Sequence, residues 1–268
     1  MFREAVQNRV NWLLGLSVFL VTVIVTPAST LDPINVPKLW ALTSISFALG
    51  ATLLTQFKVL FSKQNWQFIA SARAVFLFMF LAMLISSIAL SQQLFGVNGR
   101  NTGLITYFSF GTLFIGAAVA TSKQSVKPFM FGLIAAIGIN GIYGLIQATG
   151  NDFFNWSNPY APVIGTLGNP NFAGAFLGMG VGLALTYLVS SGLDIKYRVA
   201  ALVFIPIAIY GILRSHAQQG IVVSLLSVGL IVYYLLKYRF KNPIIKFSYL
   251  AIGLVATVFG VLGTLQKG

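Results

Sequence analysis

Nine apolar runs, each near the length of a membrane span, follow one another along this chain. They cover residues 11–29, 39–57, 74–92, 103–121, 129–148, 171–190, 199–213, 220–236 and 247–265. An α-helix needs about 20 apolar residues to cross a bilayer, and such continuous runs are unlike the alternating strands of a membrane barrel. With only 8% charged residues, the chain also lacks the polar surface of a water-soluble domain. The runs therefore predict an all-α, polytopic transmembrane helix bundle of about nine spans.

The basic residues predict how these spans are oriented. When the N-terminus is placed inside, the inner segments hold thirteen Lys and Arg residues and the outer segments hold four, which together account for all 17. The four outer ones are Lys38, Arg100, Arg214 and Lys267. This alternation follows the positive-inside rule and puts the C-terminus outside. Membrane topology thus explains the net charge of +13, and nucleic acid is not an expected partner.

The residue inventory excludes several kinds of site. The chain has no cysteine, one histidine and four acidic residues, so we expect neither disulfides nor a metal site of ordinary composition. We expect a single transmembrane domain over residues 1–268. An odd number of spans with no terminal domain after them suggests a truncated open reading frame.

The longest outer segment, residues 149–172, is rich in Asn, Gly, Pro and aromatic residues. This composition predicts an ordered loop with specific turns, which we expect to close over the mouth of the helix bundle. Trp156 and Tyr160 would either lie at the level of the lipid headgroups or stack on sugar rings. We expect Asn171 to cap the sixth span. Behind it, Gly174, Gly178 and Gly182 recur every four residues, a spacing that predicts close packing against another helix.

Two arginines lie in outer segments, where the positive-inside rule disfavours basic residues. Arg100 lies in FGVNGRNTG and Arg214 lies in ILRSHAQQG. A guanidinium group binds phosphate oxygens in pairs, so both side chains fit a pyrophosphate, although snorkelling to lipid phosphates explains them equally well. We predict that the fold brings Arg100 and Arg214 to one outward-facing cavity.

His216 stands close to Arg214 and is the chain's one side chain with an ordinary pKa near neutrality, which makes it a weak catalytic candidate. Helical spacing would pair Arg214 with Gln218 and Ser215 with Gln219 rather than with His216. Asp32 and Asp152 both lie outside, but nothing in the sequence places these carboxylates near each other.

Four passages resemble the O-antigen ligase and O-antigen polymerase superfamily of bacterial envelope glycosyltransferases. They are DPINVPK at 32–38, LFGVNGRNTGLITY at 94–107, GTLGNPNFAGAFL at 165–177 and SHAQQG at 215–220. The third, with its GNPN signature, is the most specific. In the fourth, the family often has an arginine directly after the serine. Here that position is His216, and Arg214 precedes the serine instead.

The resemblance implies a metal-independent glycosyltransferase that needs no cofactor and works on the periplasmic side of the bacterial inner membrane. Such an enzyme transfers glycan from an undecaprenyl-pyrophosphate carrier to a lipid or glycan acceptor in polysaccharide or lipopolysaccharide biosynthesis. The resemblance implies substrate-binding roles for Arg100, Arg214, Asn169 and Asn171. It also places a large outer loop with a catalytic histidine, and further spans, after the ninth span, where this chain ends.

Three alternatives stay open at this point. A ligase and a polymerase of the same superfamily share donor and geometry and differ in acceptor. A transporter would usually bury ionisable residues at mid-membrane depth, whereas this chain keeps most of its charges in loops. A non-catalytic membrane protein is the third alternative.

Overall fold

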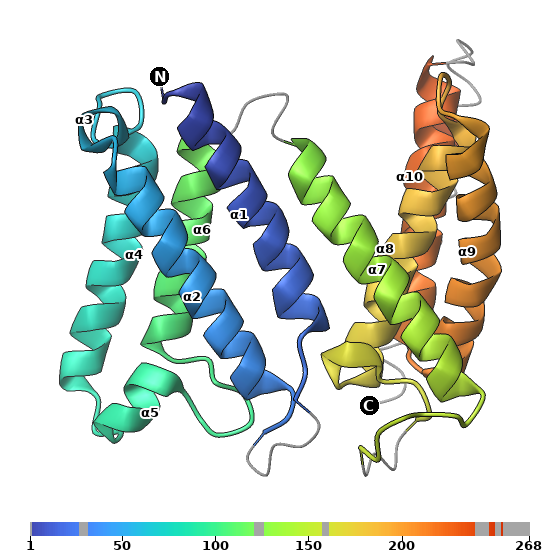
Figure 1. The fold of residues 1–268 in the computed structure, drawn as a ribbon, viewed down its shortest axis with the longest axis horizontal. Coiled ribbons are helices and arrows are strands. Elements are labelled where there is room, and N and C mark those ends of the chain that lie inside the picture. The colour runs from blue at the N-terminus through green and yellow to red at the C-terminus, as the bar shows by residue number, and fades with distance from the viewer. Residues whose placement is uncertain are drawn as a thin grey trace. The chain divides into compact units, whose positions relative to one another are not determined.

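The computed structural model describes residues 2–26, 32–120, 126–156 and 161–238, together with residues 247–249 and 253. In these ranges the chain forms helices and no strands (Figure 1). The helices are α1 (Glu4–Val23), α2 (Asn35–Leu54), α3 (Phe57–Leu60), α4 (Trp66–Ile85), α5 (Leu90–Phe95), α6 (Leu104–Ala120), α7 (Val126–Ala148), the 3₁₀ helix η2 (Gly165–Leu167), α8 (Pro170–Val189), α9 (Ile195–Arg214) and α10 (Gln218–Tyr238).

Six of these helices, α2, α4, α7, α8, α9 and α10, are long and apolar enough to cross a membrane. Their outward surfaces carry large apolar side chains. Phe47 in α2 is 81% exposed and Ile85 at the end of α4 is 88% exposed. Such surfaces are stable against lipid and not against water. The chain is therefore a multi-pass helical membrane protein.

The predicted count of nine spans remains a prediction. Helix α1 is 20 residues long but is not among the six, and α6 is a shorter apolar helix. The predicted ninth span, 247–265, lies almost entirely outside the described residues. The prediction of a single domain likewise remains a prediction.

The helices pack into two compact units. The first unit comprises residues 1–140, 153–157 and 166–168, and the second comprises residues 141–152, 158–165 and 169–268. In the first unit α2 packs against α1 and α6, around a core that includes Val10, Leu49 and Leu53. Figure 1 shows the start of α1 and α3 at one end of this unit, and α5 with the starts of α2 and α6 at the opposite end.

In the second unit α8 lies against both α9 and α10. A Cβ atom added at Gly178 would lie 2.7 Å from the carbonyl oxygen of Gly220, and one at Gly174 would lie 2.9 Å from the Oγ of Ser215. A Cβ at Gly182 would overlap Ser227. The prediction that this glycine stripe packs against another helix is confirmed, and its partner is α10 with the turn before it.

Several predicted span boundaries were wrong. The first span was placed at 11–29, but α1 covers Glu4–Val23 and residues 24–26 are not helical. The third span was placed at 74–92, but α4 covers Trp66–Ile85 and α5 is a separate helix. Arg73 does not end the helix. It lies within α4, and its guanidinium carbon is 5.3 Å from the centre of the Trp66 ring. The seventh span was placed at 199–213 but covers Ile195–Arg214, because the Asp194 side chain accepts a hydrogen bond from the backbone N–H of Lys196 and starts the helix earlier.

Candidate functional site

A connected set of polar groups joins four segments of the first unit, namely α1, α2, η2 and the part of α7 up to Asn140. The Lys38 ammonium donates to the carbonyl oxygens of Val21 and Thr22, at 2.9 and 3.0 Å. The hydroxyl of Thr166 also donates to the Thr22 carbonyl, at 2.6 Å. Asn140 in α7 accepts a hydrogen bond from the backbone N–H of Thr166 through its Oδ1. The end of α1, the start of α2 and η2 are thus held together by hydrogen bonds at apolar helix ends, where unpaired groups would be costly.

A second set joins the start of α2 to the loop that carries Arg100. Asp32 accepts hydrogen bonds from the backbone N–H groups of Ile34 and Asn35 and from the Asn35 amide. The same amide donates to the carbonyl oxygen of Gly99 at 2.7 Å. Partial burial opposes ionisation of the Asp32 carboxyl, but these three hydrogen bonds outweigh it and lower its pKa below the ordinary value.

Arg100 itself lies at the surface of the first unit. Its backbone N–H donates to the carbonyl of Val97, and the next residue, Asn101, has φ of 51°. A non-glycine residue in this left-handed region is uncommon, and short polar side chains such as Asn tolerate it best. The turn therefore presents Arg100 outward, next to the start of α6.

The GNPN segment starts α8, but a different asparagine caps the helix than the sequence suggested. Asn169 is the N-cap, and its Oδ1 accepts from the backbone N–H of Asn171 at 2.9 Å. The prediction that Asn171 is the cap was wrong. Pro170 prefers the first helical position and forces the residue before it into extended backbone, so the cap falls on Asn169, with φ of −146° and ψ of 128°.

The loop before α8 is held to α7 in the second unit. Gln147 accepts hydrogen bonds from the backbone N–H groups of Ile164 and Gly165 and donates to the carboxylate of Asp152, which also accepts from the Tyr143 hydroxyl. These contacts agree with an ordered loop. Its closure over a bundle mouth remains a prediction.

Among the loop aromatics, Trp156 packs edge-on against Phe154 in the first unit, with ring centroids 5.7 Å apart. Tyr160 lies outside the described residues. The place of Trp156 at the lipid headgroups or on sugar rings remains a prediction.

The connection between α9 and α10 is a tight turn of three residues. Helix α9 ends at Arg214 and α10 begins at Gln218, so the helical pairings expected for Arg214 with Gln218 and Ser215 with Gln219 were wrong. Ser215 is buried and its hydroxyl donates to the carbonyl of Ile212. His216 is exposed with φ of 55°, which turns the chain out of α9.

The Arg214 guanidinium donates to the carbonyl oxygen of Ala148, the last residue of α7, at 3.4 Å. A cation at this place is favoured by the partial negative charge at the C-terminal ends of α7 and α9. The side chain is otherwise exposed, so most of its donors face the surroundings of the second unit.

The four passages that carry the family resemblance fall into two contacting sets. In the first unit, 32–38 contacts 94–107 through Asn35 and Gly99, and Ile34 lies against Gly168 of the third passage. In the second unit, Gly174 of the third passage lies against the turn 215–220. Arg100 belongs to the first unit and Arg214 to the second. A shared cavity for these two residues remains a prediction, as does any pairing of Asp32 with Asp152.

Sequence reasoning missed the roles of Lys38, Asn140 and Gln147. A signal was present for Asn140 and Gln147, because strongly polar side chains within apolar runs are costly unless they have a use. The sequence did not show the hydrogen-bond partners of these side chains, because each side chain bonds to backbone groups of another segment. Within the described ranges, no three His, Asp or Glu side chains gather into a possible metal site.

Comparisons with known protein families, with curated proteins and with solved structures find no match to this chain.

Proposed function

We propose that this chain is a membrane glycosyltransferase of the O-antigen ligase type. It would transfer a glycan from an undecaprenyl-pyrophosphate donor to a lipid or glycan acceptor on the periplasmic side of the bacterial inner membrane. An O-antigen polymerase would use the same donor with a growing glycan as acceptor. The observation that carries the proposal is that the passages that resemble the superfamily contact one another within each unit, although they lie far apart in sequence.

The distribution of charge supports the proposed orientation. In the first unit, the end formed by the start of α1, α3 and the start of α4 carries Arg3, Arg9, Lys58, Lys63 and Arg73. The opposite end, with the starts of α2 and α6, carries Lys38 and Arg100. By the positive-inside rule the first end faces the cytoplasm. The passages at 32–38 and 94–107 then lie on the outer side, where a lipid-linked glycan is used.

The chemistry needs a cationic cradle for the leaving group. The bond between the anomeric carbon and the pyrophosphate oxygen breaks, the acceptor oxygen bonds to that carbon, and the acceptor's proton passes to a base. Arg100 and Arg214 would bind the departing pyrophosphate through paired N–H donors. His216 is the candidate base on the described part of the chain. Asn169 caps the helix by accepting a hydrogen bond from the backbone N–H of Asn171. Any contact of either residue with substrate would therefore use its other polar groups.

Binding of undecaprenyl pyrophosphate to the purified chain tests this proposal. Arg100→Ala and Arg214→Ala should each weaken binding about tenfold or more, because a charge-assisted hydrogen bond contributes roughly 1.5–3 kcal/mol. Arg→Lys should restore little, since an ammonium lacks the paired fork. Lys63→Ala, at the other end of the first unit, is the matched control and should bind normally.

Transfer activity completes the test. Vesicles containing the chain, a lipid-linked glycan and either a lipid or a glycan acceptor separate ligase from polymerase by the product formed. Normal donor binding by both Arg→Ala variants, or equal binding of an uncharged polyprenol, would refute the proposed role of the arginines.

A further inference from the structure

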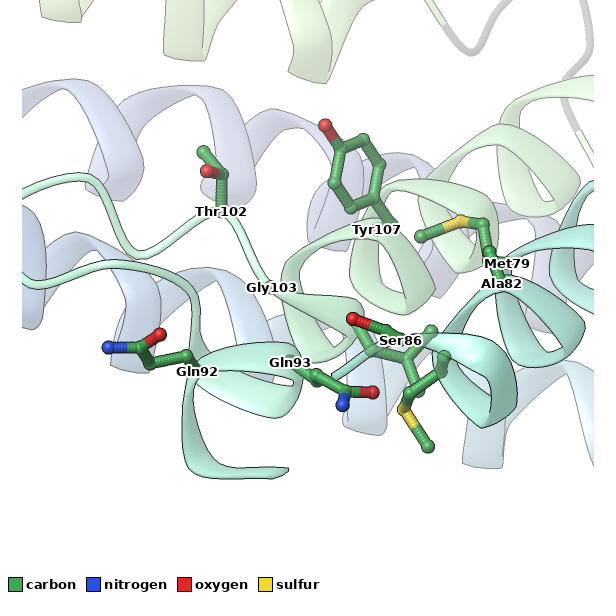
Figure 2. Close-up of a pocket in the computed structure, with 10 residues that line it drawn as sticks. Met79, Ala82, Ser86, Gln92, Gln93, Thr102, Gly103 and Tyr107 are labelled. Carbon is green, nitrogen blue, oxygen red and sulfur yellow. The ribbon is translucent and has the colours of Figure 1, made fainter. Parts of the chain in front are cut away.

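A cavity of about 260 Å³ lies at the end of the first unit that holds α5 (Figure 2). Its walls come from the last turns of α4, from α5 and from the start of α6. The lining residues are Met79, Ala82, Met83, Ser86, Gln92, Gln93, Thr102, Gly103, Leu104 and Tyr107. Two of these, Thr102 and Gly103, follow Arg100 by two and three residues.

The lining combines two kinds of surface. Met79, Ala82 and Met83 of α4 form an apolar wall. Amides and hydroxyls form the rest, and Figure 2 shows Gln93 extending from α5 toward the segment that carries Ser86. None of the lining residues carries a charge at neutral pH. A neutral group that offers both hydroxyls and C–H surface matches this lining, whereas a phosphate does not.

One buried atom of a lining residue lacks a hydrogen-bond partner within the described residues. The Gln93 amide nitrogen donates to the carbonyl oxygen of Ile88, but its Oε1 is buried and has no hydrogen-bond partner within the described residues. A buried acceptor without a donor costs free energy, so such atoms in native proteins usually bond to water or ligand. A ligand hydroxyl supplies that donor.

We propose that this cavity binds a neutral sugar unit. The assignment of that unit to the glycan next to the pyrophosphate rests on the proposed function, with Arg100 binding the phosphate side and the cavity binding the sugar side. The sugar's hydroxyls donate to Gln93 Oε1 and exchange hydrogen bonds with Thr102 and Gln92. Its C–H face lies on the α4 wall.

Thiol protection tests the cavity without requiring transfer activity. Ser86→Cys places the chain's one thiol in the cavity with little change in volume, because the chain has no native cysteine. The probes are a monoglucosyl diacylglycerol, a phosphatidylglycerol with the same acyl chains, and free maltose. We expect the glucolipid to slow alkylation by N-ethylmaleimide several-fold and the phospholipid to leave it unchanged. The control, Asn98→Cys in the neighbouring exposed turn, should not be protected.

The second arm asks whether Gln93 makes the contact. In the Ser86→Cys background, Gln93→Leu should weaken protection by the glucolipid about tenfold, and Gln67→Leu on an exposed part of α4 should leave it unchanged. Protection by maltose equal to that by the glucolipid supports the site and assigns it to free sugar. Equal protection by both lipids, or by neither, overturns it.

The two proposals fail separately. Protection by sugar with no binding of undecaprenyl pyrophosphate would keep the cavity and reject the glycosyltransferase. Pyrophosphate binding that depends on the arginines, with no protection by sugar, would do the reverse.

Discussion

The Nζ atom of Lys38 lies 3.0 Å from the backbone carbonyl oxygen of Thr22, so that a cation at the start of α2 closes the C-terminal end of α1. The last carbonyls of a helix have no intrahelical donor and carry partial negative charge. Lys38 supplies both the donors and the opposite charge. Where lipid borders the segment, water is a poor substitute for the hydrogen bonds that Lys38 donates.

Lys38→Met should therefore destabilise the protein by about 1.5–3 kcal/mol, the typical contribution of a charge-assisted hydrogen bond. Thermal unfolding in detergent measures this as a lower midpoint. Lys63→Met, which removes an exposed lysine, is the control and should unfold like the wild type. Equal midpoints for the two variants would show that Lys38 does not hold α1.

Asn169→Ala should cost about 1 kcal/mol of stability, because it removes the side chain that accepts from the N–H of Asn171. Asn171→Ala keeps that N–H and should cost much less. Chemical unfolding of the two variants side by side compares them directly. A larger loss for Asn171→Ala would contradict the assignment of the cap.

Gly178→Ala should destabilise the second unit by about 1–3 kcal/mol, because the new methyl group would crowd the Gly220 carbonyl at the α8–α10 contact. Gly138→Ala is the matched control, since a Cβ there meets no atom within 4 Å and alanine is the better helix former. We expect its unfolding midpoint to stay equal or to rise. The test fails if both variants shift alike.

Asp32 should make stability depend on pH in the acidic range. Its lowered pKa means that the folded protein favours the carboxylate, so the stabilisation is fully present above the ordinary value of about 3.9 and is lost as the pH falls through the folded pKa. Wild type should therefore be more stable than Asp32→Asn at pH 7, and the difference should shrink below about pH 4. A difference that stays constant over this range would contradict the role of the charge.

Cysteine labelling in intact cells tests the proposed orientation. A membrane-impermeant maleimide should label Asn98→Cys from outside. It should reach Lys63→Cys and Ser191→Cys only after the membrane is opened. The reverse pattern would invert the topology and remove the outer-side glycosyltransferase from consideration.

The sequence predicted the helices better than it predicted the site. Apolar runs and the spacing of Gly174, Gly178 and Gly182 were sufficient, because helix formation and close packing depend on local pattern. Helix ends were harder. Arg73 was read as a boundary because its charge interrupts the run, and nothing in the run shows that Trp66 accommodates it.

The polar contacts of the site were largely beyond prediction. Lys38 and Thr166 meet at one carbonyl oxygen although they stand 128 positions apart, a pairing that only the folded chain defines. The predicted spans left residues 214–219 as a connection, but the helical pairing expected for Arg214 with Gln218 was wrong, because α9 already ends at Arg214. The left-handed residue of this turn is His216, and non-glycine residues are uncommon in that region, so no glycine marks the turn at this position.

The three-residue turn between α9 and α10 has a consequence for how the protein is made. Three residues reach at most about 11 Å, whereas the hydrocarbon core is about 30 Å thick. One of these helices therefore cannot span the bilayer while the other still lies in water on the opposite side. In the proposed orientation the pair would enter the bilayer as one hairpin, with Arg214 and His216 at its tip.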